Sequence, residues 1–240
     1  HELREARAYA EQAMQVRSRF LATMSHELRT PISGMHGMLE LLQMSELNED
    51  QRYMLRNVIT STNNLLYLVN DVLDFSKIEA GQLQLHYQAC RLASVICDVI
   101  RGHATLAHGK GLKVTLDWAP DVPDQARIDA VRVGQVLSNL LNNAVKFTER
   151  GEIRIQVNYR AEQLLIAVSD TGIGIAEAKQ DRLFTPFEQV ESDINRRFGG
   201  TGLGLAISRE IARAHGGDIY ASSDAGLTSF TVWIPQGPSV

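Results

Sequence analysis

One long segment of this sequence carries more apolar side chains than a single neighbouring helix can cover. Asn48 is a typical N-cap residue, and Gln51 three residues later completes a capping box. The apolar side chains that follow on helical spacing are Met54, Val58, Ile59, Leu65, Leu66, Leu68, Val69, Val72, Leu73, Phe75 and Ile78. Two helical hairpins would bury this stripe between them as a dimeric four-helix bundle. The sequence therefore predicts a homodimer.

The pattern changes from helix alone to mixed helix and strand after Gly81. Residues 82–89 are expected to form a short strand or linker. Beyond them we expect helices over 92–108, 129–147 and 203–215, and strands over 112–118, 152–159, 163–169, 217–222 and 230–234. The predicted fold is an antiparallel helical hairpin over 1–80, which includes an N-terminal helix over 1–19, followed by an α/β sandwich domain over 81–240.

Composition excludes several classes of function. The 240 residues are 44% hydrophobic and carry a formal net charge of −4, so nucleic-acid binding through a basic surface is not expected. Cys90 and Cys97 lack a CxxC spacing and are expected to be free thiols. No apolar run approaches the roughly 18 residues needed to span a bilayer. The sequence opens on His1 inside a helical pattern, so we expect an excerpt of a longer protein.

Near the start, the run Ser25-His26-Glu27-Leu-Arg-Thr30-Pro31 places an imidazole beside a carboxylate on a helix. A neutral imidazole can attack phosphorus when one ring nitrogen is free and the other is held as N–H. Glu27 could accept a hydrogen bond from that N–H. Thr30 lies one helical turn after His26 on the same face, where it could place a water for hydrolysis. Pro31 is expected to bend the helix just after this site.

The helix predicted over 129–147 carries polar side chains on one face at a spacing of one turn. Asn139 and Asn143 are four residues apart, and Lys146 lies one turn further along. The amide oxygen of Asn143 could contribute one ligand to an octahedral Mg²⁺ that phosphates and water complete. Lys146 would add positive charge near phosphate groups. A helix that is merely polar on its outer face is the alternative.

Two glycine-containing motifs follow. Asp170-Thr-Gly172-Ile-Gly174 comes after a buried strand, and a carboxylate there can accept hydrogen bonds from the exocyclic amine of adenine but not from the keto oxygen of guanine. The glycines allow close approach of the backbone and positive φ. An isolated DxGxG is more often a simple turn.

The second motif is Gly200-Thr201-Gly202-Leu-Gly204, at the start of the helix predicted over 203–215. Backbone N–H groups at a helix start favour phosphate, and Arg197 just before the motif could reach it. The Lys-Ser/Thr pair of a Walker loop is absent, and the position of the glycines does not fit a Rossmann fold.

The four motifs, in this order and spacing, resemble the sensor histidine kinases of two-component systems. The likeness runs from about Arg17 to Pro235 and includes the aromatic run Leu183-Phe184-Thr-Pro-Phe187. It implies a dimerisation and phosphotransfer hairpin, entered by a signalling helix, and a catalytic domain of the gyrase and Hsp90 type that binds ATP and Mg²⁺. The site residues it implies are His26, Glu27, Thr30, Asn139, Asn143, Lys146, Asp170, Gly172, Gly174, Arg197, Gly200, Thr201, Gly202 and Gly204.

The resemblance further implies ATP-dependent phosphorylation of His26, transfer of the phosphoryl group to an aspartate of a response-regulator receiver domain, and reverse phosphatase activity. It also implies the cytoplasmic portion of a membrane-anchored bacterial sensor. Two alternatives stay open. One is a regulatory interaction module that forms a heterodimer with another histidine kinase and turns over little ATP. The other is a free-standing ATPase clamp like Hsp90 or MutL.

Overall fold

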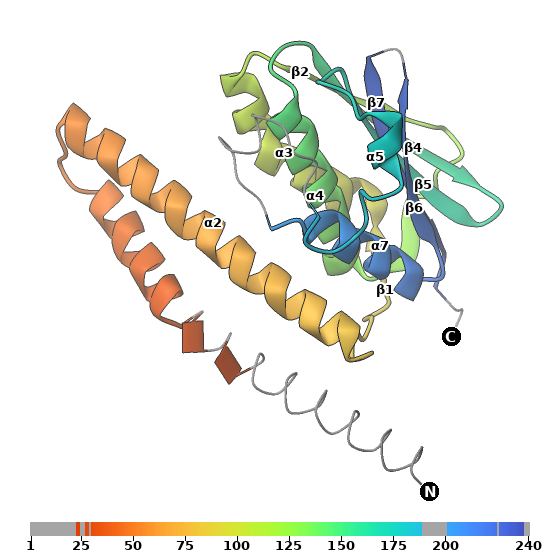
Figure 1. Cartoon of the computed structure of the whole chain (residues 1–240), viewed down its shortest axis with the longest axis horizontal. Coiled ribbons are helices and arrows are strands. Elements are labelled where there is room, and N and C mark those ends of the chain that lie inside the picture. Colours follow the sequence, from red (N-terminus) through yellow and green to blue (C-terminus); the bar gives the residue numbers. More distant parts are fainter. Residues whose placement is uncertain (1–22, 25–26, 29, 189–200, 225, 238–240) are drawn as a thin grey trace, which may run out of the picture. The chain divides into compact units, whose positions relative to one another are not determined.

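The computed structural model describes residues 23–24, 27–28, 30–188, 201–224 and 226–237, and these fall into two compact units, 1–83 and 84–240. The first unit is a helical hairpin: residues 30–43 are helical, and α2 (Glu49–Glu79) runs back antiparallel to them (Figure 1). The predicted capping box is confirmed. Gln51 N–H donates to Asn48 Oδ1 at 2.8 Å, and Asn48 N–H donates to Gln51 Oε1 at 3.0 Å.

The predicted stripe leaves much apolar surface exposed on this hairpin. Leu55 and Leu73 are buried inside it. The large apolar side chains that stay exposed on the two helices between residues 35 and 72 are Met35, Met38, Leu41, Leu42, Tyr53, Met54, Val58, Leu65, Tyr67, Leu68 and Val72. This exposed apolar surface is larger than a pair of helices in water usually has. The hairpin therefore has an apolar face that its own two helices leave uncovered.

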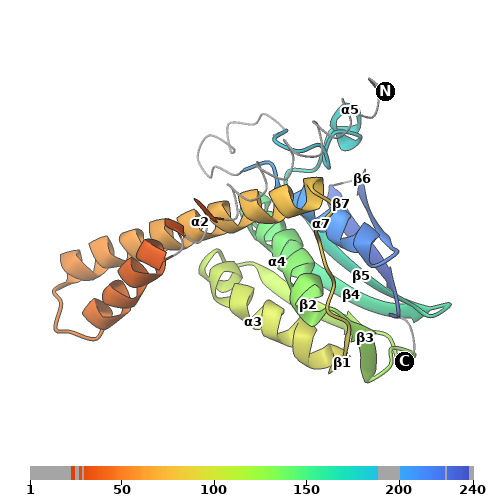
Figure 2. The ribbon, with the colours of Figure 1, turned by 90° about the horizontal axis from the view of Figure 1, so that it is seen from below.

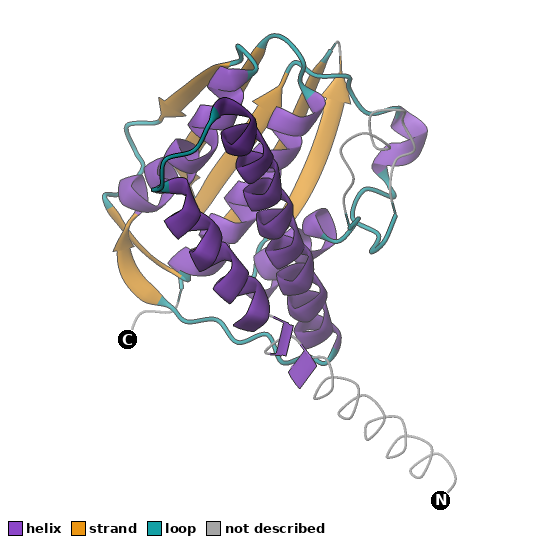
Figure 3. Cartoon of the chain, turned by 90° about the vertical axis from the view of Figure 1, so that its left-hand side faces the viewer, coloured by secondary structure: helices purple, strands orange, loops and turns teal. Residues whose placement is uncertain are grey.

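The second unit is a five-stranded sheet with three helices on one face (Figures 2 and 3). The strands are β2 (Lys113–Trp118), β4 (Glu152–Arg160), β5 (Gln163–Asp170), β6 (Asp218–Asp224) and β7 (Leu227–Pro235), in the order β2-β4-β5-β7-β6. Neighbouring strands are antiparallel except β2 and β4, which are parallel. The helices are α3 (Leu92–Gly109), α4 (Ala130–Phe147) and α7 (Gly204–Ala214).

The core lies between the helices and the sheet because alternate strand residues point toward the helices. Ile155 on β4, Ile166 on β5, Leu140 on α4 and Ile207 on α7 are each at most 1% exposed. Full burial of each such side chain contributes about 1.5–3 kcal/mol to folding. The helical-hairpin and α/β architecture predicted from the sequence is therefore confirmed.

Three elements differ from the sequence expectation. The predicted strand or linker over 82–89 becomes a strand only at its end, as β1 (Gln88–Arg91), and β1 pairs with an unexpected strand, β3 (Gln125–Ile128). A short helix, α5 (Glu177–Gln180), was also not expected. The two-stranded ladder joins residues far apart in sequence, so local periodicity carried no sign of it. Pro31 lies within the helical residues 30–43.

Candidate nucleotide site

Asn139, Asn143 and Lys146 lie on α4 as expected, but in different environments. The Asn139 amide nitrogen donates to the Gly204 carbonyl oxygen and to Ser208 Oγ, both at 3.2 Å, so this side chain fastens α4 to the start of α7. Asn143 is half-buried, and its side chain makes no hydrogen bond within the described part of the chain. Burial lowers the pKa of Lys146, whose Nζ lies 4.8 Å from the centre of the Phe147 ring. Asn143 therefore has its amide oxygen available for a ligand.

Asp170 ends β5 with its side chain turned inward, at 5% exposure. Its Oδ1 accepts the Gly172 N–H at 2.9 Å and the Thr148 hydroxyl at 3.4 Å. Burial raises the pKa of Asp170, although the bonds from Gly172 and Thr148 act in the opposite direction. Both bonds end on Oδ1, so among the described residues Oδ2 remains as an acceptor.

The turn after Asp170 is packed against the end of α4. Ile173 N–H donates to the Phe147 carbonyl oxygen at 3.3 Å. A Cβ on Gly172 would lie 2.5 Å from that same carbonyl oxygen, which is closer than side-chain carbons come to backbone oxygen. Gly174 has a φ of +73°, a conformation that glycine adopts without strain. Both glycines of the motif are thus required by the backbone path.

We predict that Gly172→Ala destabilises the protein by about 1–3 kcal/mol, because the added methyl group forces the turn away from α4. The free energy of urea-induced unfolding measures this effect. Gly102→Ala is the matched control, since Gly102 lies on α3 with nothing within 4 Å of an added Cβ. The control should be neutral or stabilising by up to about 1 kcal/mol. Equal stability of the two variants would contradict this account of Gly172.

The glycine cluster is described from Thr201 onward. Gly202 has a φ of +70°, and a Cβ there would lie 2.9 Å from the Phe187 carbonyl carbon and from the Glu188 carbonyl oxygen. Thr201 Oγ1 accepts the Leu203 N–H at 3.1 Å. In the described structure α7 begins at Gly204 without a side-chain cap and without an acidic residue in its first turn. Its first N–H groups are consequently suited to an anion.

The aromatic run contains a half-buried ring, Phe184, and an exposed one, Phe187. The Phe184 ring meets the Phe230 ring edge-on at 6.5 Å, and the Arg209 guanidinium lies 4.9 Å from the Phe184 ring centre. Phe187 is 65% exposed and has a φ of +63°, which is unfavourable for a bulky residue. Its N–H donates to the Gly202 carbonyl oxygen at 3.2 Å, and this bond ties the run to the glycine cluster.

The structure brings part of the predicted site together. Hydrogen bonds connect Asn139 with Gly204, and Gly172 with Asp170. Sequence reasoning missed Thr148, a fully buried hydroxyl that orients Asp170; its position directly after α4 is the only sequence signal. Glu27 and Thr30 are exposed helical residues. The predicted residues His26, Arg197 and Gly200 lie outside the described residues.

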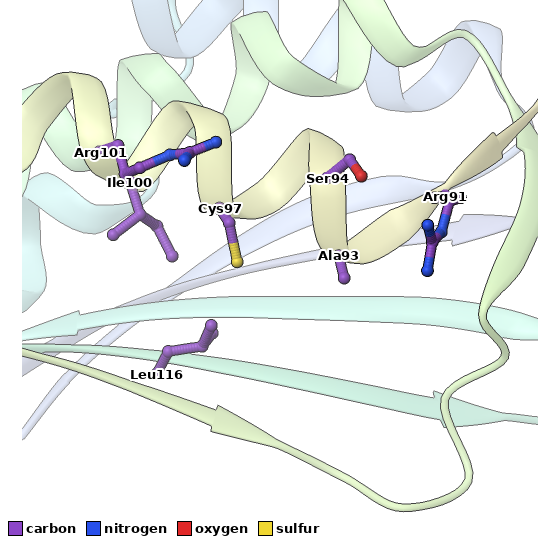
Figure 4. Close-up of a pocket in the computed structure, with 7 residues that line it drawn as sticks. All are labelled: Arg91, Ala93, Ser94, Cys97, Ile100, Arg101 and Leu116. Atoms are coloured by element: carbon purple, nitrogen blue, oxygen red, sulfur yellow. The ribbon is translucent and has the colours of Figure 1, made fainter.

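A separate groove lies between α3 and β2. It has a volume of about 540 Å³ and is lined by Arg91, Ala93, Ser94, Cys97, Ile100, Arg101 and Leu116 (Figure 4). None of these residues belongs to the predicted nucleotide site. Cys90 and Cys97 are free thiols, as expected.

Comparison with known proteins assigns both units. Residues 16–81 match the family described as the His Kinase A (phospho-acceptor) domain, and residues 128–238 match the family described as the histidine kinase-, DNA gyrase B- and HSP90-like ATPase. The chain belongs to the histidine kinase family. The ATP-binding domain of this histidine kinase is therefore the unit that contains Asn143, Asp170 and the glycine cluster.

Two relatives illustrate the likeness of this histidine kinase to curated proteins. The signal transduction histidine-protein kinase BarA of Shigella flexneri is 44% identical over 255 residues, which cover 100% of this chain and 28% of that protein. The autoinducer 2 sensor kinase/phosphatase LuxQ of Vibrio cholerae is 40% identical over 235 residues, covering 96% of this chain and 27% of that protein. The chain thus spans between a quarter and a third of these relatives.

Solved structures give the same assignment. Full-length ShkA in complex with AMPPNP has a TM-score of 0.74 at 32% identity, over 92% of this chain and 46% of that one. The Acinetobacter baumannii histidine kinase AdeS has a TM-score of 0.63 at 28% identity, over 89% of this chain and 98% of that one. In the part of the histidine kinase that the structure describes, none of the helices combines the length and apolar character of a membrane span.

Proposed function

We propose that this chain transfers the γ-phosphoryl group of ATP to His26 and then to an aspartate of a response-regulator receiver domain. The observation that carries the proposal is the buried Asp170 carboxylate at the edge of a glycine-lined turn, in a chain whose first unit matches a phospho-acceptor family. We propose the functional division at residues 80 and 81, with phosphotransfer in the first part and ATP binding in the second.

The described residues fit an adenine nucleotide. Asp170 has an oxygen left to accept a bond from the adenine amine, since its internal bonds end on Oδ1. Gly172 lets the turn after Asp170 pack against the end of α4, and Gly202 lets the glycine cluster pack against Phe187 and Glu188, where a methyl group would collide. The uncapped start of α7 and the cation of Lys146 are suited to phosphate oxygens. We propose Thr201, Gly204, Arg197 and Gly200 as further phosphate neighbours and Gly174 as part of the base-binding turn.

Mg²⁺ would be held by the Asn143 amide oxygen together with phosphate oxygens, and it would neutralise phosphate charge during transfer. Asn143 fits this role because it lies half-buried on α4 and its side chain makes no hydrogen bond within the described structure. We propose that Asn139 contributes indirectly, since its amide nitrogen fastens the phosphate-facing start of α7 to α4.

The transfer step follows from the acceptor sequence. Glu27 accepts the N–H of one His26 nitrogen, which leaves a lone pair on the other nitrogen to attack phosphorus. The new nitrogen–phosphorus bond forms as the bond between the γ-phosphorus and the bridging oxygen breaks, and ADP leaves with that electron pair. We propose that Thr30 positions water for the reverse reaction, hydrolysis of the phosphorylated partner.

We propose a homodimer as the working assembly. The uncovered apolar face of the hairpin supports it, because a second copy would bury the exposed side chains of α2 and its partner helix. A mixed dimer with another histidine kinase would use the same face, and no described residue favours it. The relatives named as sensor kinases support the proposal that this chain is the cytoplasmic portion of a membrane-anchored bacterial sensor.

Incubation of the chain with γ-labelled ATP and Mg²⁺ tests the proposal directly. We expect a phosphoprotein that is labile in acid and stable in base, as a nitrogen–phosphorus bond requires. Addition of a receiver domain should then remove the label from the chain. A chain that binds no adenine nucleotide in calorimetry, or whose label is stable in acid, would contradict the proposal.

A further inference from the structure

His215, which follows α7, is buried and bonded through both ring nitrogens to backbone groups. It is 4% exposed; Nδ1 lies 2.8 Å from the Ile211 carbonyl oxygen, and Nε2 lies 3.4 Å from the Asp129 backbone nitrogen. A carbonyl can only accept and a backbone N–H can only donate. The ring must therefore carry its proton on Nδ1 and keep a lone pair on Nε2. This arrangement requires a neutral histidine.

Asp129, at the start of α4, makes two different connections with its two carboxylate oxygens. Oδ1 accepts the Arg132 N–H at 3.0 Å and so caps α4. Oδ2 accepts the His86 N–H at 2.9 Å, a bond that spans 43 residues of sequence. Asp129 is itself only 4% exposed, so both bonds are shielded from water. One side chain thus connects the first turn of α4 to the segment that precedes β1.

We call residues 84–91 the connecting segment, because they join α2 to the rest of the second unit. The Tyr87 ring packs edge-on against the His215 ring, at 5.5 Å and 74°. A Cβ on Gly237 would lie 2.4 Å from Tyr87 Cδ1, so the end of the chain also packs against this tyrosine. The connecting segment is therefore enclosed by groups from α4, α7 and the tail.

The Asp129–His215 contact is one fastening between α4 and α7. The bond from Asn139 to Gly204 and Ser208 is another. Asn139 lies ten residues beyond Asp129, and Gly204 lies eleven residues before His215, so the two fastenings are separated by about 15 Å along each helix. Two fixed points on antiparallel helices determine how the glycine-bearing start of α7 faces Asn143.

We propose that Asp129 and His215 are positioning residues of the phosphotransfer reaction, which fasten the connecting segment to the helix that carries Asn143 and Lys146. The segment continues from the unit that carries His26, so this fastening restricts how the acceptor and the nucleotide can approach one another. The inference rests on the proposed function for its catalytic consequence. The fastening itself can be measured without catalysis.

Protonation of His215 opposes the fastening. A proton on Nε2 would face the Asp129 N–H, which cannot rotate away. The groups that face the ring are the Asp129 carboxylate of α4 and the Tyr87 side chain of the connecting segment. Burial lowers the pKa of His215 and outweighs the Ile211 carbonyl and Asp129, which raise it. The folded-state pKa lies below the unfolded one, so this stability is complete above about pH 6.5 and is lost as the pH falls below it.

Asp129→Asn separates the two functions of the carboxylate. Asparagine caps helices as well as aspartate does, so its oxygen keeps the Arg132 bond. Its NH₂ group would then face the His86 N–H, donor against donor, and the connecting segment would be released. Asp121→Asn is the matched control, because it removes the same charge from an exposed residue.

For the full chain, we expect Asp129→Asn to speed amide hydrogen exchange of residues 84–91 by at least about tenfold, with residues 130–136 unchanged. The Kd for a non-hydrolysable ATP analogue should stay within about twofold, whereas the phosphorylation rate at saturating ATP should fall by about tenfold. Unchanged hydrogen exchange of residues 84–91 would overturn the proposed fastening. Faster exchange with an unchanged phosphorylation rate would overturn the positioning role of Asp129. Wild-type chain that never becomes phosphorylated would instead refute the proposed function.

A second comparison tests His215. His215→Gln keeps an acceptor near the position of Nε2 but cannot be protonated. Protection of residues 84–91 from hydrogen exchange should therefore be independent of pH between about 5 and 7 in this variant, whereas wild type loses protection as the pH falls through this range. His103→Gln is the control, because His103 Nε2 faces the Ser138 hydroxyl at 3.3 Å, which can rotate to donate or accept. A wild-type chain with equal protection across this range, after correction for intrinsic exchange, would overturn the role of His215.

Discussion

His26→Gln should abolish phosphorylation of the chain by ATP and leave ATP binding within about twofold of wild type. Glutamine keeps a polar side chain of similar reach, but its amide nitrogen has no lone pair able to attack phosphorus. The expected loss is complete, because no other histidine in the sequence is followed both by an adjacent carboxylate and by a hydroxyl four residues later. Incorporation of label from γ-labelled ATP measures the first effect, and calorimetry with an ATP analogue measures the second.

His36→Gln is the matched control for this variant. His36 lies within the helical residues 30–43 and pairs with Glu40 at 3.3 Å, an ordinary contact between residues one turn apart. It should keep full phosphorylation. Label in the His26→Gln chain equal to that in the control would show that another residue is the acceptor.

Mixed dimers extend the same experiment. A His26→Gln chain can still bind ATP, and an Asp170→Asn chain still has the acceptor. If phosphorylation crosses between subunits, a mixture of the two should recover label on the Asp170→Asn chain. If it stays within one subunit, the mixture should remain unlabelled at an ATP concentration well below the Kd of the Asp170→Asn chain, because neither chain then has both a bound nucleotide and the acceptor.

Asp170→Asn should weaken ATP binding by about 10- to 100-fold. Its oxygen can keep the bonds from Gly172 and Thr148 on the Oδ1 side, but its NH₂ group would then face the adenine amine. A buried donor opposite another donor costs about 1–3 kcal/mol, which corresponds to this loss of affinity. Calorimetric titration with an ATP analogue gives the change in Kd.

The same substitution should stabilise the nucleotide-free protein at neutral pH. Burial raises the pKa of Asp170 in the folded state, so the folded protein binds a proton more readily than the unfolded chain does. The ionised Asp170 carboxylate therefore destabilises the folded protein once the pH rises above the pKa that aspartate has in the unfolded chain. Asparagine does not ionise and carries no such penalty. In urea unfolding at several pH values, Asp170→Asn should have a larger free energy of unfolding than wild type at neutral pH, and this difference should disappear in acid.

Asp117→Asn, on the exposed surface of β2, should change neither binding nor this pH dependence. ATP affinity of Asp170→Asn equal to that of this control would exclude Asp170 as the residue that contacts adenine. Greater stability with weaker binding is the combination expected of a residue kept for function.

The elements that the sequence predicted well are those with local causes. The capping box at Asn48 joins residues three apart, and the apolar period of 129–147 continues through one helix. The ladder of β1 with β3 and the parallel pairing of β2 with β4 were not anticipated, because each joins segments separated by dozens of residues. The pairing of β7 with the other side of β5 likewise required the folded chain.

The candidate site shows the same division. Residue types and spacing predict Asn143, Lys146 and Asp170 as nucleotide-binding residues, and these three assignments remain predictions. Sequence alone could not show that Asn139 uses its amide within the protein, nor that Phe187 lies exposed while Phe184 is half-buried against Phe230. His26, Arg197 and Gly200 remain predictions, as does the homodimer.

By itself the sequence determined the chemistry available to this histidine kinase: an imidazole beside a carboxylate, an amide on a helix, a carboxylate before glycines. Only the tertiary structure decided which polar groups form hydrogen bonds with one another inside the protein. Asp129 and His215 lie 86 residues apart, yet they share one buried hydrogen bond. The reason is that a buried polar group must find its partner wherever the chain path brings one, and that path depends on the whole fold.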